Sequence, residues 1–198
     1  MQKPDIHRLI ELQKLLLAFS HVERKVYRKH KDTYIYENDT EHSYNLAMTA
    51  WYLAKWFPSL DRETVIKVGL AHDFVEIYAG DTYIYASKEE LATKKEREQA
   101  ALERLLQEWP DFDDIFAAIN AYESKDSNEA KFVYALDKIM PIIAVYINDG
   151  HSWKEQDITV KMLHSVKNGK VSISPEVVPY YDALMEILIH HPEVIRPR

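Results

Sequence analysis

The chain has 198 residues, and 46% of them are hydrophobic, including thirteen tyrosines and four tryptophans, a composition that supports a sizeable core and excludes disorder. No cysteine is present, so disulfides and thiolate ligands are excluded, and any metal must be held by His and carboxylate groups. The formal net charge of −7 argues against a surface for nucleic-acid polymers but not against a small phosphorylated substrate, because a metal and local cations can reverse the field inside a pocket.

The N-terminal segment has no signal-peptide pattern, because its apolar stretch at 15–19 is short and spaced like an amphipathic helix. No run approaches the ~20 apolar residues that span a bilayer. From these two features we expect a soluble, cytoplasmic protein without a membrane segment.

Hydrophobic residues recur with the period of an α-helix, and the alternation typical of strands is nearly absent. In chain order we expect helices over 6–19, 42–56, 62–79, 87–109, a short stretch after 111, 129–148 with a kink at Pro141, 153–168 and 175–190. The polar, Tyr-rich segment 28–38 should be a loop. The sequence therefore predicts a single all-α domain over residues 1–198, with six to eight helices and a motif core at about 38–140.

Two candidate metal ligands, His72 and Asp73, lie in the apolar segment VIKVGLAHDFVEIYAG, which we expect to be one helix. Their side chains point about 100° apart, so both could reach a metal over the face between them. Glu76 lies four residues after His72 and therefore on the same face. Such groups on a buried turn are costly unless they are paired or metallated, so the alternatives are a metal site and a hydrogen-bonded His–Asp pair in the core.

His42 and Asp137 lie on two other expected helices. A His near a helix N-terminus, as His42 is, can be either a ligand or an ordinary surface residue. Asp137 lies on the apolar face of the segment KFVYALDKIMPIIAVY, where an ionised carboxylate needs a cation or several donors. The candidates are a metal, Lys138 and a His from a neighbouring helix, with a plain buried salt bridge as the alternative.

Together, His42, His72, Asp73 and Asp137 would offer a mixed nitrogen and oxygen site. Such a site suits Mn²⁺, Fe²⁺, Co²⁺, Ni²⁺ or Zn²⁺ better than Ca²⁺, and Mg²⁺ is a further candidate. Four protein ligands leave positions on an octahedral ion for a water and a phosphate oxygen. A metal there would polarise the phosphoryl group and lower the pKa of the attacking water, and Glu76 is the candidate base or orienting group for that water.

The order of these residues resembles the H…HD…D signature of the HD superfamily of metal-dependent phosphohydrolases. EHSYNLAMTAWYLA, AHDFVEIYAGD and FVYALDKI resemble, in turn, the E-H-S segment of the family, the HD-x-x-E-x-x-x-G-D segment of its bacterial 5′-deoxynucleotidase branch and its distal Asp helix. The resemblance covers about residues 5–190. It implies an HD-domain helical bundle in which His42, His72, Asp73 and Asp137 hold one divalent metal ion.

The resemblance also implies roles around the metal. Glu76 would be the catalytic carboxylate near the attacking water, and Asp81 would lie at the rim of the pocket, where it contacts the sugar or orders the water. The segment VERKV resembles the one whose Arg approaches the substrate phosphate, which nominates Arg24, with Arg28 as a rival.

After Asp81 the chain reads TYIYASKEE in place of the Pro-containing turn of the deoxynucleotidase branch, which leaves the substrate open. Tyr83 and Tyr85 in this stretch could stack on a base or simply pack the loop. The following basic residues are expected to form a solvated helix face: Lys94, Lys95 and Arg97.

The function expected from these features is hydrolysis of a nucleoside monophosphate, in the first place a deoxyribonucleoside 5′-monophosphate, to nucleoside and phosphate. Arg24 or Arg28 would stabilise the charge of the transition state. Nucleoside triphosphates or another phosphoester are alternative substrates. A non-catalytic, metal-binding helical interaction module is an alternative of a different class. Proteins of this branch often form dimers, so the resemblance also implies a homodimer.

Overall fold

Helices dominate the computed structural model, which describes residues 3–197. In chain order the elements are α1 (Ile6–Phe19), β1 (Glu23–His30), β2 (Thr33–Asn38), α2 (Asp39–Ala54), α3 (Arg62–Ala71), α4 (Glu76–Ala79), α5 (Lys88–Glu108), α6 (Asp113–Ser124), α7 (Asn128–Ile147), α8 (His151–Glu155), α9 (Val160–Val171) and α10 (Val178–Ile189). The predicted all-α class is confirmed, and α4 and α8 are single short turns. Within residues 3–197 no helix has both the length and the hydrophobicity needed to cross a bilayer.

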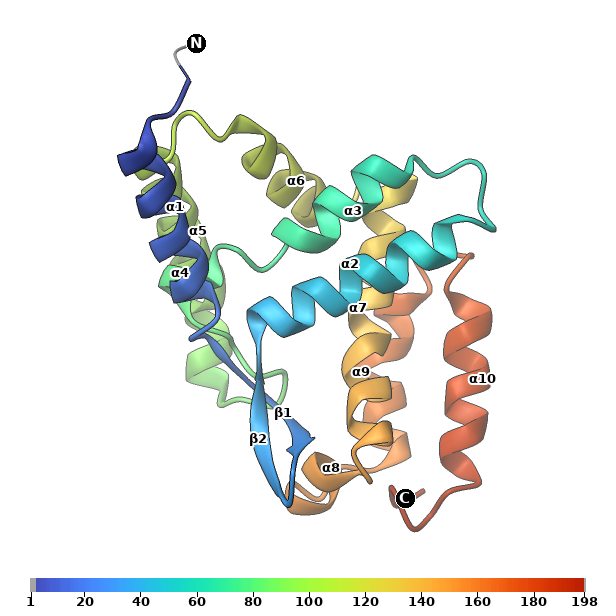
Figure 1. Ribbon diagram of the computed structural model, residues 1–198. Helices are drawn as coiled ribbons and strands as arrows, with labels where there is room; N and C mark the ends of the chain where they lie inside the picture. The colour runs from blue at the N-terminus through green and yellow to red at the C-terminus, as the bar shows by residue number, and fades with distance from the viewer. Residues whose placement is uncertain (1–2, 198) are drawn as a thin grey trace.

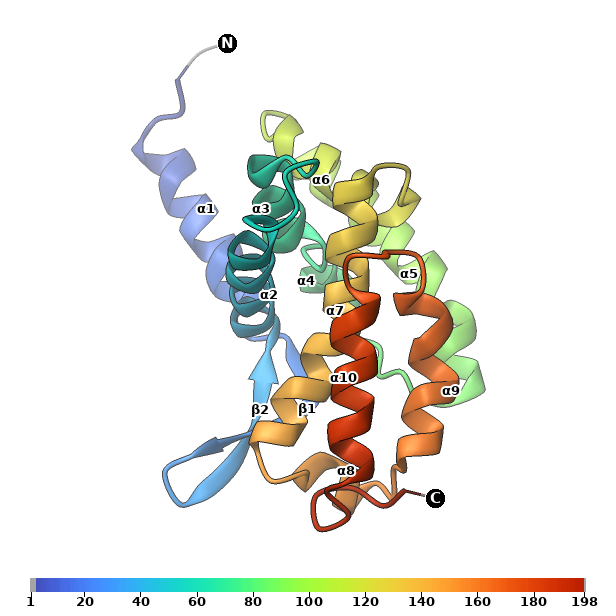
Figure 2. The same cartoon turned by 90° about the vertical axis from the view of Figure 1, so that its right-hand side faces the viewer.

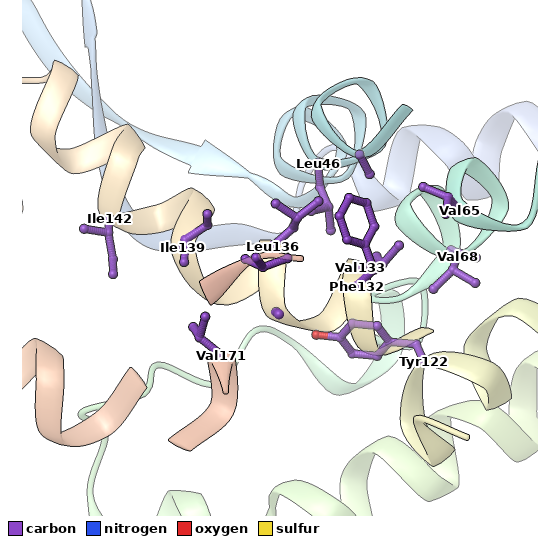
Figure 3. Packing of buried hydrophobic residues seen from close by; sticks show 14 of the residues in the cluster. Leu46, Val65, Val68, Tyr122, Phe132, Val133, Leu136, Ile139, Ile142 and Val171 are labelled. Carbon is purple, nitrogen blue, oxygen red and sulfur yellow. The ribbon is translucent and has the colours of Figure 1, made fainter. Parts of the chain in front are cut away.

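The central element is α7, which packs against α2, α3, α6 and α9 (Figure 1). Because neighbours cover it on several sides, apolar residues occur around most of its circumference. In Figure 3, Leu46 of α2 and Val65 and Val68 of α3 gather around Phe132 and Leu136 of α7. Full burial of such side chains contributes about 1.5–3 kcal/mol each, so this cluster fixes how α2 and α3 sit on α7.

The close contact between α2 and α3 depends on Gly69. A Cβ atom at this position would lie 2.9 Å from the Cα of Ala47 on α2. The two helices carry His42 and His72, near the start of one and at the end of the other. The spacing between the helices therefore also sets the spacing between the two histidines.

The expected loop at 28–38 was wrong, because these residues belong to an antiparallel hairpin of β1 and β2. The turn after His30 has no Asn-Gly or Asp-Gly pair, the usual sequence signal of a hairpin. Lys31 takes the positive φ there, at 54°. Packing holds the strands together: the rings of Tyr27 and Tyr36 stack at 4.5 Å, and the Tyr27 amide donates to Ser152 Oγ beyond α7.

Two expected helices are each broken in two. The stretch predicted at 62–79 ends as α3 at Ala71, then forms a turn and resumes as α4 at Glu76. The turn is closed by the Glu76 amide, which donates to the Asp73 carbonyl at 2.8 Å. The segment predicted at 153–168 is split into α8 and α9, because Asp157 takes a φ of 56° and Thr159 caps the start of α9.

Replacing Gly69 with Ala should destabilise the fold by about 1–3 kcal/mol, because the added methyl group would push α2 away from α3. Helix propensity alone favours Ala over Gly by about 1 kcal/mol, so any loss reports the clash. Gly169 on α9 provides the matched control, since a Cβ there meets nothing within 4 Å. Urea unfolding of both variants tests this: Gly169→Ala should be as stable as the parent or more so, and a stable Gly69→Ala would contradict the packing argument.

Candidate metal centre and pocket

Four side chains from three parts of the chain meet at one point: His42, His72, Asp73 and Asp137. One ligand atom from each lies within 4.8 Å of all the others. His42 is in the first turn of α2, whose start is fixed by a capping box between Asn38 and Glu41. The His42 residue is 1% exposed, which rules out the surface alternative for it.

The short distances in this group pair each histidine with a carboxylate. His42 Nε2 lies 2.9 Å from Asp137 Oδ1, and His72 Nε2 lies 3.0 Å from Asp73 Oδ2. The crossed distances are 3.9 Å from His42 Nε2 to Asp73 Oδ2 and 3.7 Å from His72 Nε2 to Asp137 Oδ1. Two imidazole nitrogens and two carboxylate oxygens therefore face a common centre, as the ligands of one small cation do.

The hydrogen bonds of His72 fit a metal ligand. Its Nδ1 lies 3.0 Å from the carbonyl oxygen of Gly69, which can accept but not donate, so Nδ1 carries a proton. Its Nε2 is buried and has no hydrogen-bond partner of good geometry, although Asp73 is close. Metal-ligating histidines are usually oriented in this way by a backbone carbonyl on the other ring nitrogen.

The electrostatics of the two histidines differ. Burial, followed by the charge of Arg24, lowers the pKa of His42 to about 4, so its imidazole is neutral and able to act as a ligand. Burial also lowers the pKa of His72, but the charges and hydrogen bonds of Asp73 and Asp137 outweigh burial and raise it to about 9. The carboxylates that hold a proton on His72 would equally hold a divalent cation in its place.

Asp137 is anchored so that one oxygen stays free for the centre. Tyr122 donates its hydroxyl to Oδ2 at 2.5 Å, and Lys138 forms an ion pair with the same oxygen. Burial raises the pKa of Asp137, but Lys138 and the two histidines lower it well below its usual range. The salt bridge with Lys138 and the contact with a neighbouring His, which the sequence offered as alternatives, are therefore both present.

Arg24 and Arg28, the rival arginines, occupy different environments. The Arg24 side chain is 11% exposed, and its Nη1 donates to Asp39 Oδ1 at 3.0 Å and to Asp73 Oδ2 at 2.8 Å. Its Nε lies 3.5 Å from Glu37 Oε2. Arg28 pairs with Glu41, with both side chains one-third exposed. Arg24 therefore holds a candidate metal ligand in place, whereas Arg28 does not line the pocket beside the centre.

The pocket opens beside Asp73 and Asp137 and is lined mainly by charged side chains. They include Arg24, Asp73, Glu76, Asp81, Lys94, Asp137, Lys138 and Lys167. Glu76 is buried, its Oε2 has no partner, and its Oε1 lies 3.9 Å from Lys94 Nζ. Burial and then the nearby Asp73 raise the pKa of Glu76 well above its usual value. Asp81 is partly exposed in this lining, and burial raises its pKa as well.

The expected solvated face on α5 was wrong for two of its three residues. Lys94 lines the pocket, and Arg97 donates to the Ala79 carbonyl at 2.6 Å and to Thr82 Oγ1 at 2.8 Å. Lys95 is exposed as predicted. Arg97 therefore ties α5 to the segment after α4, a contact between helices that the pattern of a single helix does not reveal.

Tyr83 and Tyr85 pack against each other, with ring centroids 5.5 Å apart. The Tyr83 hydroxyl contacts Gln156, and Tyr83 also lines the pocket. Loop packing, one of the two alternatives for this pair, is therefore observed, and the Tyr83 ring is in addition accessible from the pocket. Asp39 and Lys167 also lie at the site. Neither belongs to a recognisable sequence motif, and the tertiary fold brings both to the site.

Comparison with known proteins identifies the family. The family model described as HD domain matches residues 20–178, so the chain belongs to the HD-domain family. The chain is similar to the crystal structure of a protein from Magnetospirillum magnetotacticum MS-1 described as a predicted metal-dependent phosphohydrolase. The two chains are 26% identical, the match covers 94% of this chain and 95% of the other, and the TM-score is 0.78.

A second solved structure, an HD-domain phosphohydrolase from Listeria innocua, is 13% identical and has a TM-score of 0.55. That match covers 92% of each chain and supports the fold alone. No curated protein matches this chain in sequence.

Replacing Arg24 with Met should destabilise the protein by about 3–5 kcal/mol, because Asp39 and Asp73 would lose their shared buried cation. Arg28→Met is the matched control: its exposed pair with Glu41 is worth about 0–1 kcal/mol. Chemical unfolding of the two variants at neutral pH checks the difference. Equal losses in the two variants would show that Arg24 does not stabilise the acidic group.

Proposed function

We propose that this protein is a metal-dependent phosphohydrolase in which His42, His72, Asp73 and Asp137 bind one divalent ion. The observation that carries the proposal is that the four ligand atoms lie within 4.8 Å of one another. They lie beside a pocket whose lining includes cationic side chains and the buried carboxyl group of Glu76. The similarity to the protein from Magnetospirillum magnetotacticum supports the reaction class. The ion is Mn²⁺, Fe²⁺, Co²⁺, Ni²⁺, Zn²⁺ or Mg²⁺ by the chemistry of its ligands.

Residues of the pocket supply the other parts of a hydrolysis. A bound divalent ion would supply Lewis acidity to the phosphoryl group and lower the pKa of water, so that hydroxide is available as the nucleophile at neutral pH. Glu76 is the candidate base for a water in the pocket: burial and neighbouring carboxylates raise its proton affinity, and the charge of Arg24 acts in the opposite direction, favouring the ionised form that a base needs. Lys94 and Lys138 balance the negative charge of the phosphoryl group as the new P–O bond forms and the ester bond breaks. Asp81, at the edge of the pocket, is the candidate proton donor to the departing alcohol oxygen.

Within this class we propose a nucleoside 5′-monophosphate, and in the first place a deoxyribonucleoside 5′-monophosphate, as substrate. The support is the resemblance of AHDFVEIYAGD to the deoxynucleotidase segment and the ring of Tyr83 in the pocket lining, which offers an aromatic face for a base. Such a substrate, together with the absence of cysteine, fits a reducing cytoplasm. We also propose that the described residues form a single domain, because α1, the hairpin and α9 all contact the elements that carry the centre.

The test is phosphate release from a panel of nucleoside mono- and triphosphates, with Mn²⁺, Co²⁺ or Mg²⁺ added, together with calorimetric titration of Mn²⁺ into the protein. The parent should release phosphate only with metal. Asp137→Ala should lose both metal binding and turnover, because Asp137 provides a ligand. Glu76→Gln should keep Mn²⁺ binding and lose turnover by about a hundredfold or more, as expected for a missing general base.

Full activity of Glu76→Gln would refute its role as base, and unchanged Mn²⁺ affinity of Asp137→Ala would refute the ligand set. A metal-loaded parent that releases phosphate from none of the substrates would favour the alternative of a non-catalytic metal-binding module. Release of phosphate from triphosphates in preference to monophosphates would change the assigned substrate but leave the proposed metal centre unchanged.

We propose further that two copies of the chain associate through the exposed side of α1 and α2. An apolar groove between α1, α2, α3 and α6 is lined by Leu16, Phe19, Tyr44, Leu70, Phe74 and Phe112, among others. From Tyr44 an exposed stripe continues along α2 through Met48, Trp51 and Tyr52. A two-fold interface needs protruding side chains and a groove on the same face, and this face offers both.

Trp51→Glu should convert the dimer into a monomer, because a carboxylate would be placed in the proposed apolar interface. Ile187→Glu on α10 is the matched control, since Ile187 is similarly exposed but lies on another helix. Light scattering coupled to size-exclusion chromatography measures the mass of each protein. A monomeric parent, or a Trp51→Glu protein that stays dimeric, would contradict this interface.

A further inference from the structure

Lys167 is a buried lysine that lines the pocket from α9, outside the segments that carry the HD motif. The residue is 7% exposed. Helix α9 packs against α7, the helix of Asp137, and the two run side by side in Figure 1. On another side α9 lies next to α10, as Figure 2 shows. The side chain therefore enters the pocket from a part of the fold that sequence motifs do not mark.

The two pocket cations beside the proposed metal centre have carboxylate partners. Arg24 pairs with Asp39 and Asp73, and Lys138 pairs with Asp137. Within residues 3–197, Lys167 makes neither an ion pair with a carboxylate nor a side-chain hydrogen bond. Partial desolvation of a lysine without a carboxylate partner is costly, and among the described residues its Nζ is not one of the fully enclosed unpaired polar atoms, so the ammonium faces the pocket.

The surroundings of Lys167 are positively charged. Burial, then the charge of Lys138, lowers the pKa of Lys167 to about 7, and Lys170 and Arg24 act in the same direction. Lys170 lies three residues further along α9, on the same side of the helix, and burial lowers its pKa also. The charge of Asp137 raises the pKa of Lys167, but the Asp137 Oδ2 is already paired with Lys138. Near pH 7 Lys167 is therefore only partly protonated, and an anion entering the pocket would favour its charged form, which no carboxylate pairs with.

We propose that Lys167 binds the non-bridging oxygens of the substrate phosphoryl group and makes the pocket selective for phosphomonoester dianions. This inference rests on the proposed phosphohydrolase function and extends it to a residue outside the motif. A monoester dianion has one more negative charge than a diester, and Lys167 is the unneutralised buried cation available for that charge. Lys167 is a binding residue here; it neither moves a proton nor contacts the metal.

The experiment is calorimetric titration of inorganic phosphate into the full chain, with and without stoichiometric Mn²⁺. Lys167→Met, which keeps the aliphatic volume, should bind phosphate about tenfold more weakly or worse, the loss expected for one charge-assisted hydrogen bond. Lys161→Met, an exposed lysine on the same helix, should bind phosphate like the parent. Lys167→Arg should retain part of the affinity, because it keeps the charge.

Thermal unfolding of the ligand-free variants separates a binding role from a structural one. Removing an unpaired buried ammonium should raise the unfolding midpoint of Lys167→Met, by on the order of 2–4 °C for a chain of this size. A lysine that served the fold would lower the midpoint on replacement. Weaker phosphate binding together with a lower midpoint would therefore overturn the proposal.

Phosphate affinity unchanged within about twofold in Lys167→Met, or a parent that binds no phosphate with or without Mn²⁺, would also overturn it. The outcomes are distinct from those of the proposed function. A parent that binds phosphate through Lys167 but hydrolyses no ester would remove the function and keep this site. A parent that hydrolyses monoesters while Lys167→Met binds phosphate normally would keep the proposed function and remove the role of Lys167.

Discussion

The structure depends on one electrostatic constraint, the burial of more negative than positive side chains where α2, α3 and α7 meet. Five carboxyl groups lie there: Glu37, Asp39, Asp73, Glu76 and Asp137. Within residues 3–197 Arg24, Lys94 and Lys138 pair with them, and so does the His72 ring, whose pKa, despite burial, Asp73 and Asp137 raise to about 9. Burial raises the pKa of Glu37 to about 7 and that of Asp39 to about 6, so the excess is relieved by bound protons. A divalent cation between the histidines and aspartates would relieve it more fully.

The convergence of His42, His72, Asp73 and Asp137 could be anticipated from the resemblance of their segments to the HD signature. For His72, Asp73 and Asp137 the apolar residues around them pointed the same way, whereas His42 has no such signal. A polar group on an apolar face must turn towards a partner, and the partners available in a helical protein without cysteine are the other groups of this kind. The sequence pattern indicates which residues meet but not the backbone geometry that brings them together. The expected helix over 62–79 places His72 and Asp73 in mid-helix. In the structure the break before α4 lets Asp73 and Glu76 face the pocket together.

The hairpin and Lys167 could not be found in the same way, because neither has a local signal. The hairpin has a polar sequence and an unusual turn, and it is stabilised by contacts with residues far along the chain, such as Ser152. Yet it decides which arginine reaches the site. Pairing of Glu23 with Asn38 brings Arg24 next to the first turn of α2, where Asp39 meets it, while Arg28 lies further along the strand beside Glu41.

The pocket consequently has two walls of different origin. The acidic wall comes from the HD segments and the α7 Asp, whose positions are tied to one another by the packing of α2 and α3 on α7. The basic wall comes from α5 and α9, through Lys94 and Lys167, whose helices contact the core at other points. In the proposed function, a phosphate between the walls would be held by the metal side for its chemistry and by the lysine side for its charge. Changes in α5 or α9 can therefore alter which phosphoester is accepted while the metal centre stays the same.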